Sequence, residues 1–294
     1  MNYAASYSFG KEQLITAHVP DAPLEARLLL EHVCHTTHHD LLAHGDRILS
    51  PEEETHYRAL LQKRANRIPL SYLTGTAEFM GLPFQVNSSV LIPRADTEIL
   101  VEEAIPLLTT GTRFLDLCTG SGCIALSLLH FCKGTSAVAT DLSPDALQVA
   151  RANAERLGLQ ARISFLFCDL FPAHREESFP LIVSNPPYIR TEVIPTLEAE
   201  VKDHEPMQAL DGGGDGLLFY RRILSLLPLL LERGGHLLLE IGYDQHAAVV
   251  RLMKQAGLVS LKSIKDLAGR DRVICGTLPP LPLQSVGIHR EAFP

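Results

Sequence analysis

Paired cysteines, long apolar runs and an excess of basic residues are all missing from this 294-residue chain. Its six cysteines form no C-x-x-C pair, and most lie in apolar segments where a free cysteine packs as a small hydrophobic residue. No segment approaches the roughly 20 uncharged apolar residues of a membrane-spanning helix. Residues 1–6 have no basic stretch followed by an apolar run, so no secretory signal is expected. We therefore expect a soluble protein of the reducing cytoplasm that does not bind membranes.

The charge balance limits the choice of partner. A net charge of -8 argues against a protein whose affinity comes from neutralising many phosphates, so direct nucleic-acid binding is not expected. The one dense basic stretch, residues 62–67, closes a helix, where cations offset the helix dipole, and we interpret it as a solvated helix end. The length indicates about two domains. A hydrophobic fraction of 46% is ample for their cores.

The N-terminal part, residues 11–67, shows helical spacing and no strand signal, which predicts a small helical bundle. Pro23 opens its first helix. The apolar face of that helix is predicted to consist of Leu24, Leu28, Leu29 and Val33. Ser50, Pro51 and Glu53 then form a capping box for a second helix. This second helix carries Tyr57, Leu60 and Leu61.

Histidines crowd the segment between these two helices. They are His32, His35, His38, His39 and His44. The Thr36-Thr37 break separates them and no paired carboxylates accompany them, so they do not complete a closed tetrahedral set of zinc ligands. We expect a solvated inter-helix loop here and no metal site.

From residue 68 onward the pattern changes to strand and helix. Residues 68–90 alternate and are punctuated by glycines, which predicts a β-hairpin, and helical spacing resumes at residues 99–108. Strands are predicted at residues 113–117, 136–140, 163–168, 181–184, 236–241, 259–264 and 272–276. Helices are predicted at residues 124–131, 144–157, 217–231 and 245–256. This alternation predicts an α/β fold with a doubly wound, mostly parallel, seven-stranded sheet whose last two strands form an antiparallel edge hairpin.

The segment Leu181–Tyr188 predicts a buried central strand that runs into an Asn-Pro-Pro-Tyr turn. Because each proline lacks an N–H and fixes its own φ, the carbonyls of Asn185 and Pro186 are held in a stiff turn beside the Asn185 amide oxygen. Such acceptors suit a planar group with an NH2, such as a carboxamide or an exocyclic base amine, with the Tyr188 ring as a lid. The alternative is that Asn185 simply ends the strand and Tyr188 belongs to the core.

Three strand ends indicate a cofactor site. The first strand turns into its helix through Cys118, Thr119, Gly120, Ser121 and Gly122, where the glycines allow close approach of a ligand and the helix N-terminus favours an anionic group. The second strand ends at Asp141, where a carboxylate accepts hydrogen bonds from ribose hydroxyls, and the third ends at Asp169, placed to receive an adenine amino group. The spacing is not G-x-G-x-x-G, so the pattern favours a nucleoside without a pyrophosphate. S-adenosylmethionine fits this description.

At these residues the chain resembles class I S-adenosylmethionine-dependent methyltransferases and, more closely, the release-factor glutamine N5-methyltransferase family. The resemblance covers the chain from about Leu24 to Gly276. It rests on Arg67–Gly75, Leu91–Arg94 with Asp96–Glu98, Asp116–Gly122, Asn185–Tyr188, Glu205-Pro206 with Ala209-Leu210 and Asp215–Leu217, and Lys265-Asp266 with Asp271-Arg272. The Asn-Pro-Pro-Tyr turn alone also occurs in DNA and RNA amino-methyltransferases, whereas the hairpin with the helical part is more specific.

The resemblance implies a Rossmann-like transferase that methylates the glutamine of the Gly-Gly-Gln loop of peptide chain release factors, the proteins of translation termination. It implies that S-adenosylmethionine, with S-adenosylhomocysteine as product, is bound by residues 118–122, Asp141, Asp169, Leu170 and Asn185. It also implies that Asn185, Pro186, Pro187 and Tyr188 hold the glutamine and that Asn185, Pro186 and Tyr188 are catalytic. The chain departs from the family at three positions. Cys118 stands where glycine is usual, Leu170 where an aromatic residue is frequent, and Ala95 where proline is common. The first two departures bear on cofactor affinity.

The predicted organisation is a helical substrate-docking domain at 1–67, a hairpin linker at 68–92, a methyltransferase domain at 93–276 and a proline-rich tail at 277–294. We expect a monomer. The alternatives are glutamine methylation of a ribosomal protein and, from a different class, amino-methylation of a nucleic acid, which the acidic balance disfavours.

Overall fold

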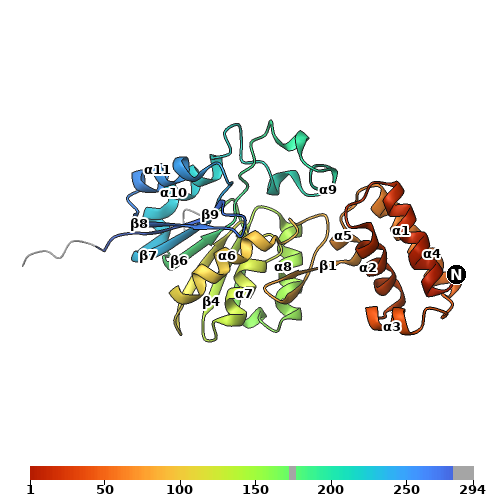
Figure 1. Cartoon of the computed structure of the whole chain (residues 1–294). Coiled ribbons are helices and arrows are strands. Elements are labelled where there is room, and N and C mark those ends of the chain that lie inside the picture. Colours follow the sequence, from red (N-terminus) through yellow and green to blue (C-terminus); the bar gives the residue numbers. More distant parts are fainter. Residues whose placement is uncertain (172–176, 281–294) are drawn as a thin grey trace, which may run out of the picture.

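The computed structural model describes residues 1–171 and 177–280. Figure 1 shows a bundle of helices at one end, joined through a hairpin to a larger α/β part. The predicted tail is described only as far as Pro280, so residues 281–294 lie outside the described residues. Within the described part of the chain, no helix has the length and apolarity needed to cross a membrane.

The helical bundle packs around a core of its own. Its helices are α1 (Tyr3–Thr16), α2 (Ala22–Cys34), α3 (His38–Ala43), α4 (Pro51–Ala65) and α5 (Leu70–Thr74). The fully buried residues include Tyr3, Leu14, Leu29, Leu30 and Tyr57. The Tyr57 hydroxyl donates a hydrogen bond to the Ala26 carbonyl at 3.0 Å, so the core aromatic of α4 is also tied to α2.

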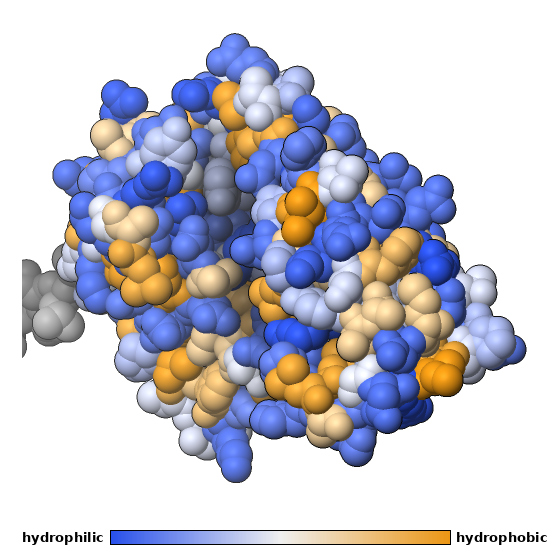
Figure 2. All heavy atoms as spheres, turned by 45° about the vertical axis from the view of Figure 1, so that its right-hand side comes forward, coloured by the Kyte–Doolittle hydropathy of each residue, from blue (hydrophilic) through white to orange (hydrophobic). Residues whose placement is uncertain are grey.

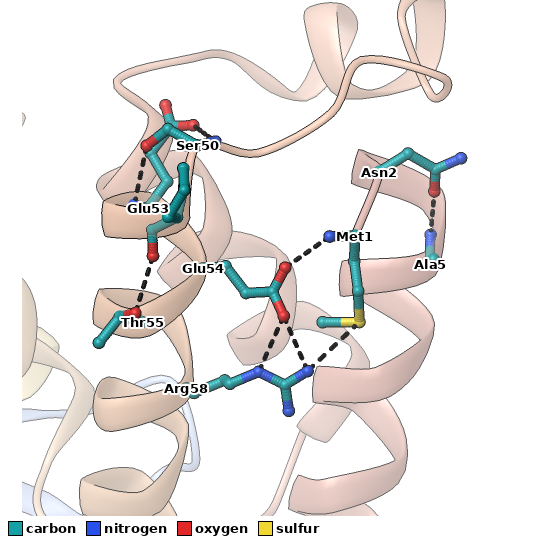
Figure 3. A network of polar contacts seen from close by, with 9 residues as sticks. Met1, Asn2, Ala5, Ser50, Glu53, Glu54, Thr55 and Arg58 are labelled. Atoms are coloured by element: carbon teal, nitrogen blue, oxygen red, sulfur yellow. Dashed lines mark hydrogen bonds and ion pairs between the residues drawn. The ribbon is translucent and has the colours of Figure 1, made fainter.

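The capping box predicted at Ser50 is confirmed. The Glu53 N–H donates to the Ser50 hydroxyl at 3.1 Å, and the Ser50 N–H donates to the Glu53 carboxylate at 2.7 Å. The next residue of α4, Glu54, accepts from the amino group of Met1 at 2.5 Å and from Arg58 at 3.0 Å (Figure 3). These contacts fix the start of α4 against the start of α1.

Two predictions for the bundle are wrong. Leu24 does not belong to the buried face of α2 and is 45% exposed, because the buried stripe of this helix runs through smaller residues as well. That stripe consists of Ala22, Ala26, Leu29, Leu30, Val33 and Cys34. The histidine-rich segment is not simply a loop, since Thr37 and Asp40 form a second capping box that starts the short helix α3.

The hairpin is formed by β1 (Thr76–Phe79) and β2 (Leu82–Gln85), paired antiparallel as predicted. Phe79 and Phe84 pack edge to face and enter the core cluster of the α/β part. Asn153 fixes the hairpin from the other side, because its side chain accepts from the Gln85 N–H at 2.6 Å and donates to the Gln85 carbonyl at 3.0 Å. The hairpin is therefore packed onto the α/β part.

The sheet of the described residues has seven strands in the order β5-β4-β3-β6-β7-β9-β8, which confirms the predicted fold class. Its strands are β3 (Arg113–Leu117), β4 (Ser136–Asp141), β5 (Ile163–Phe167), β6 (Phe179–Ser184), β7 (Leu231–Glu240), β8 (Val259–Lys265) and β9 (Asp271–Thr277). Pairing is parallel from β5 to β7 and antiparallel around β9, so the edge hairpin is confirmed too. β6, which leads into the Asn-Pro-Pro-Tyr turn, is the central strand.

Helices cover both faces of this sheet (Figure 1). One apolar cluster packs α6 (Ala95–Ala104) and α7 (Cys123–Phe131) on one face, where α8 (Pro144–Arg156) adds Ala154. The other cluster packs α10 (Leu218–Leu230) and α11 (His246–Gln255). α6 begins at Ala95 instead of the predicted 99, because its first turn is polar and carries no apolar period.

Candidate functional site

A cavity opens at the carboxyl edge of the parallel strands, where the ends of β3, β4, β5 and β6 meet. Of the predicted site residues, it is lined by Cys118, Thr119, Gly120, Ser121, Asp141, Asp169, Leu170, Asn185 and Pro187. Further lining residues include Arg94, Thr97, Pro206, Ala209 and Phe219. Gly122, Pro186 and Tyr188 lie beside the cavity and are not among its lining residues.

The loop after β3 is held in a strained, compact form. Gly120 has φ of 54° and Gly122 has φ of 81°, and a Cβ at Gly122 would lie 3.2 Å from that of Ala150. Cys118 also adopts a left-handed φ, of 59°, which favours glycine and costs other residues about 1–2 kcal/mol. The Thr119 hydroxyl donates to the Asp116 carboxylate on β3 at 2.6 Å and thereby fixes the turn to the strand that precedes it.

Asp141 links this loop to the end of β4. Its carboxylate accepts from the Gly120 N–H at 2.8 Å and from the Ser143 N–H at 2.9 Å. Burial raises its pKa, and these backbone hydrogen bonds oppose that rise. Ser143 caps α8 with its own hydroxyl, which accepts from the Ala146 N–H at 3.1 Å. Asp141 is therefore not needed as the helix cap. Its carboxylate lines the cavity and is held in place by the two backbone N–H groups.

The end of the cavity beyond β5 combines a carboxylate with an aromatic ring. Asp169 accepts from the Arg222 guanidinium at 2.7 Å, and the same guanidinium lies 5.6 Å from the centre of the Phe219 ring. Leu170 lines the cavity here and is buried. Phe219 carries no signal of a site in the sequence, because it belongs to the amphipathic helix α10, where an aromatic residue is expected to be core.

Asn185 projects into the cavity from the turn after β6. Its amide nitrogen donates to the Thr97 hydroxyl on α6 at 3.2 Å. The Tyr188 hydroxyl donates to Glu240 at 3.2 Å, and the Tyr188 carbonyl accepts from Gln245 at 2.9 Å. The tyrosine of the turn is thus anchored through both its hydroxyl and its backbone.

The wall opposite the strand ends is held by an ion pair between a partly exposed arginine and a buried glutamate. Arg94 binds the carboxylate of Glu205, which also accepts from the Ile92 N–H at 3.4 Å. Burial raises the Glu205 pKa, and the neighbouring Arg94 lowers it in part. Because Pro206 and Ala209 line the cavity directly after Glu205, the ion pair fixes this wall. No cluster of three or more possible metal ligands occurs among residues 1–171 and 177–280.

Comparison with known proteins defines the class. The family model described as "Methyltransferase small domain" matches residues 95–235, and that described as "PrmC N-terminal domain" matches residues 7–75. The crystal structure of a methyltransferase from Pyrococcus furiosus shares the fold, with a TM-score of 0.53 and 19% identity over 74% of this chain and 98% of that chain. The fold and the family models together define a class I methyltransferase.

Relatives of known function narrow the class further. The release factor glutamine methyltransferase of Caulobacter vibrioides is 40% identical over 278 residues, which cover 94% of this chain and 96% of that protein. The protein of the same name from Moorella thermoacetica is 44% identical over 252 residues, 85% of this chain and 89% of that protein. The chain belongs to the release factor glutamine methyltransferase family. The resemblance stated from the motifs is thereby confirmed.

Proposed function

We propose that this enzyme transfers a methyl group from S-adenosylmethionine to the side-chain amide nitrogen of the glutamine in the Gly-Gly-Gln loop of peptide chain release factors. The observation that carries the proposal is the Asn185 amide, which lies in the cavity with its nitrogen engaged by Thr97. Its oxygen is therefore directed away from Thr97 and can accept from the NH2 of a carboxamide. The membership of the family supports glutamine as that carboxamide.

The residues of the cavity fit the cofactor. Asp141 offers a carboxylate to the ribose hydroxyls, and Asp169 offers one to the adenine amino group. The Ser121 and Thr140 hydroxyls also belong to lining residues, and both are buried without a hydrogen-bond partner among the described residues. Such groups are costly unless a ligand or water satisfies them. S-adenosylmethionine, when bound, supplies an electrophilic methyl group on a sulfonium.

The protein contributes mainly alignment. An amide nitrogen is a poor nucleophile because its lone pair is delocalised into the carbonyl, and the barrier to amide rotation of about 18–20 kcal/mol gauges that conjugation. A hydrogen bond to Asn185 turns the glutamine nitrogen toward the methyl group, but it is worth only about 0.5–1.5 kcal/mol net. Alignment of the reacting atoms contributes about 7–11 kcal/mol as effective molarity. The nitrogen loses its proton after methyl transfer, so no strong base is needed beforehand.

We assign Phe219 to the adenine end of the site, where it supplies the aromatic surface that Leu170 lacks. Phe219→Ala is expected to weaken S-adenosylhomocysteine binding by about tenfold, because stacking on a base is worth about 1–3 kcal/mol. Phe219→Trp tests this more directly, because the chain has no other tryptophan. We expect its fluorescence to be quenched on saturation with S-adenosylhomocysteine. Phe131→Trp, a position at the end of α7 outside the cavity lining, is the control, and equal quenching in both variants would contradict the assignment.

We assign residues 1–67 to docking of the protein substrate, residues 68–92 to the linker and residues 93–276 to catalysis. The end of the bundle nearest the cavity wall is held by Arg64, which is buried and contacts Glu200 on α9 (Ala199–Lys202) at 3.0 Å. Arg67 contacts Glu200 at 2.9 Å as well. Figure 2 shows apolar side chains scattered among polar ones on the face turned toward the viewer. Exposed apolar residues of the bundle could thus contact a protein chain.

Leu24→Asp is expected to raise the KM for the release factor about tenfold with little change in cofactor affinity. Leu24 is exposed at the start of α2. In the turn before it, the His18 carbonyl accepts from Arg67 at 2.9 Å, and Arg67 also contacts Glu200 on α9. Leu42→Asp is the matched control, because Leu42 is 71% exposed on α3, far from α9 (Figure 1). Equal KM values for the two variants would argue against docking at the α2 end.

The proposed function is tested by a methylation assay with mass mapping. Purified release factor and purified ribosomal proteins are each incubated with enzyme and isotopically labelled S-adenosylmethionine. We expect label in the release factor, on the glutamine of the Gly-Gly-Gln peptide, and its loss when that glutamine is replaced by alanine. Label on a ribosomal-protein glutamine with none on the release factor would instead assign the enzyme to the ribosomal substrate.

A further inference from the structure

Polar residues from three segments lie directly behind the Asn-Pro-Pro-Tyr turn. Two of these segments carry the Asp96-Thr97-Glu98 and Asp271-Arg272 motifs, which have no part in the proposed chemistry. Thr97 lies in the first turn of α6, Glu240 is the last residue of β7, and Arg272 is near the start of β9. β7 is the parallel neighbour of β6, with Ser184 opposite Leu239, so Glu240 lies beside the beginning of the turn. Three separate segments thus bring polar side chains to the rear of Asn185.

Two hydrogen bonds tie these buried side chains to the turn. The Asn185 amide donates to the Thr97 hydroxyl at 3.2 Å, and the Tyr188 hydroxyl donates to Glu240 at 3.2 Å. Burial raises the Glu240 pKa to about 7, and Thr97, Arg272 and Tyr188 each lower it in part. Thr97 and Glu240 are 3% and 1% exposed. The Thr97 hydroxyl and the Glu240 carboxylate thus both lie buried behind the turn, each bonded to one of its residues.

The direction of the hydrogen bonds follows from this arrangement. A threonine hydroxyl has one proton to donate and lone pairs to accept with. In the structure the lone pairs of this hydroxyl accept from the Asn185 NH2. An Asn185 rotated by 180° about its last bond would present its oxygen to Thr97 and its NH2 to the cavity. The observed orientation leaves the Asn185 oxygen for the substrate.

We propose that Thr97 is a positioning residue, which fixes the orientation of the Asn185 amide and so directs its oxygen to the substrate. Glu240 holds the Tyr188 hydroxyl of the same turn, and Arg272 holds this region together through ion pairs with Asp96 at 3.0 Å and Asp266 at 3.1 Å. The Asp96-Thr97-Glu98 and Asp271-Arg272 motifs are thereby given a role in the reaction. This inference rests on the proposed function of Asn185.

Thr97→Val tests the inference, since it keeps the shape of the side chain and removes the hydroxyl. We expect kcat to fall about 10- to 100-fold, because misplacement by about 1 Å costs about 100-fold in rate. The affinity for S-adenosylhomocysteine, measured by calorimetry, should change less than about threefold, because the substitution affects the alignment of the substrate and not the binding of the cofactor. Thr97→Ser keeps the hydroxyl and should restore most of the activity. Thr135→Val is the matched control, because Thr135 is a buried threonine at the opposite end of the sheet, with its hydroxyl bonded to the Cys132 carbonyl at 2.7 Å.

A double-mutant cycle separates positioning from a general loss of structure. If Thr97 acts through Asn185, then Thr97→Val should reduce kcat no further in an Asn185→Ala background. Additive losses, a failure of Thr97→Ser to restore kcat, or unchanged kcat in Thr97→Val would each overturn the inference. Unchanged turnover in Asn185→Ala itself would instead refute the proposed function. The two failures are therefore distinguishable in one set of five proteins.

Discussion

Asn185→Ala is expected to lower the turnover of glutamine methylation by more than about 100-fold while weakening cofactor binding only a few-fold. The substitution removes the acceptor that orients the substrate NH2, and a misaligned nitrogen loses most of the effective molarity of about 10⁵–10⁸ M on which the reaction depends. The cofactor retains Asp141, Asp169 and the loop after β3, all of which line the same cavity. Single-turnover transfer of labelled methyl and calorimetry with S-adenosylhomocysteine measure the two effects separately.

Asn87→Ala is the control for this experiment, because Asn87 is an exposed asparagine on the link between the hairpin and α6. Its side chain accepts only from the nearby Ser89 N–H among the hydrogen bonds described, at 2.9 Å. We expect wild-type turnover from this variant. Turnover of Asn185→Ala within a few-fold of Asn87→Ala would show that the Asn-Pro-Pro-Tyr turn does not hold the substrate.

Asp141→Ala is expected to weaken S-adenosylhomocysteine binding by about 10- to 100-fold. A carboxylate that accepts from neutral hydroxyls contributes about 1.5–3 kcal/mol, and Asp141 also holds the loop after β3 through Gly120. Removing it therefore loosens both the ribose contact and the loop. The prediction is checked by calorimetry, with circular dichroism to show that the fold is retained.

Asp145→Ala supplies the matched control, since Asp145 is an exposed aspartate in the first turn of α8, four positions after Asp141. It changes the local charge by the same amount without touching the cavity lining. We expect its affinity to remain within about twofold of the wild type, because surface charge effects are typically below about 1 kcal/mol. Equal losses in both variants would indicate long-range electrostatics instead of a ribose contact.

The central strands β3, β4 and β6 could be predicted closely because their sequences are mostly apolar runs bounded by polar or glycine residues, whereas β7 begins at Leu231 instead of the predicted 236. β3 matches its predicted span, and the turn after β6 begins at Asn185 as the two prolines require. The β1–β2 hairpin could be predicted from the alternating pattern of residues 68–90. The β8–β9 hairpin could be predicted because the link between these strands is too short for a crossover helix. The cofactor loop, Asp141, Asp169, Leu170 and Asn185 are brought together because parallel strands end at the same edge of the sheet.

Other features depend on tertiary contacts that leave no local pattern. The polar first turn of α6 has no apolar period, so neither its helical form nor the contact of Thr97 with Asn185 could be expected. Phe219 looks like an ordinary apolar residue of α10 until the strand ends are placed around it. Cys118 adopts a left-handed φ that its residue type disfavours, and only the surrounding turn imposes it. Leu24 is exposed because smaller residues occupy the buried stripe of α2.

The most direct test is a crystal structure of the enzyme with S-adenosylhomocysteine and a release factor that carries the Gly-Gly-Gln loop. We expect the glutamine amide nitrogen to donate to the side-chain oxygen of Asn185 and to face the sulfur of the bound product. We also expect the Asn185 nitrogen still to donate to Thr97. A glutamine bound elsewhere, or an Asn-Pro-Pro-Tyr turn directed away from the sulfur, would contradict it.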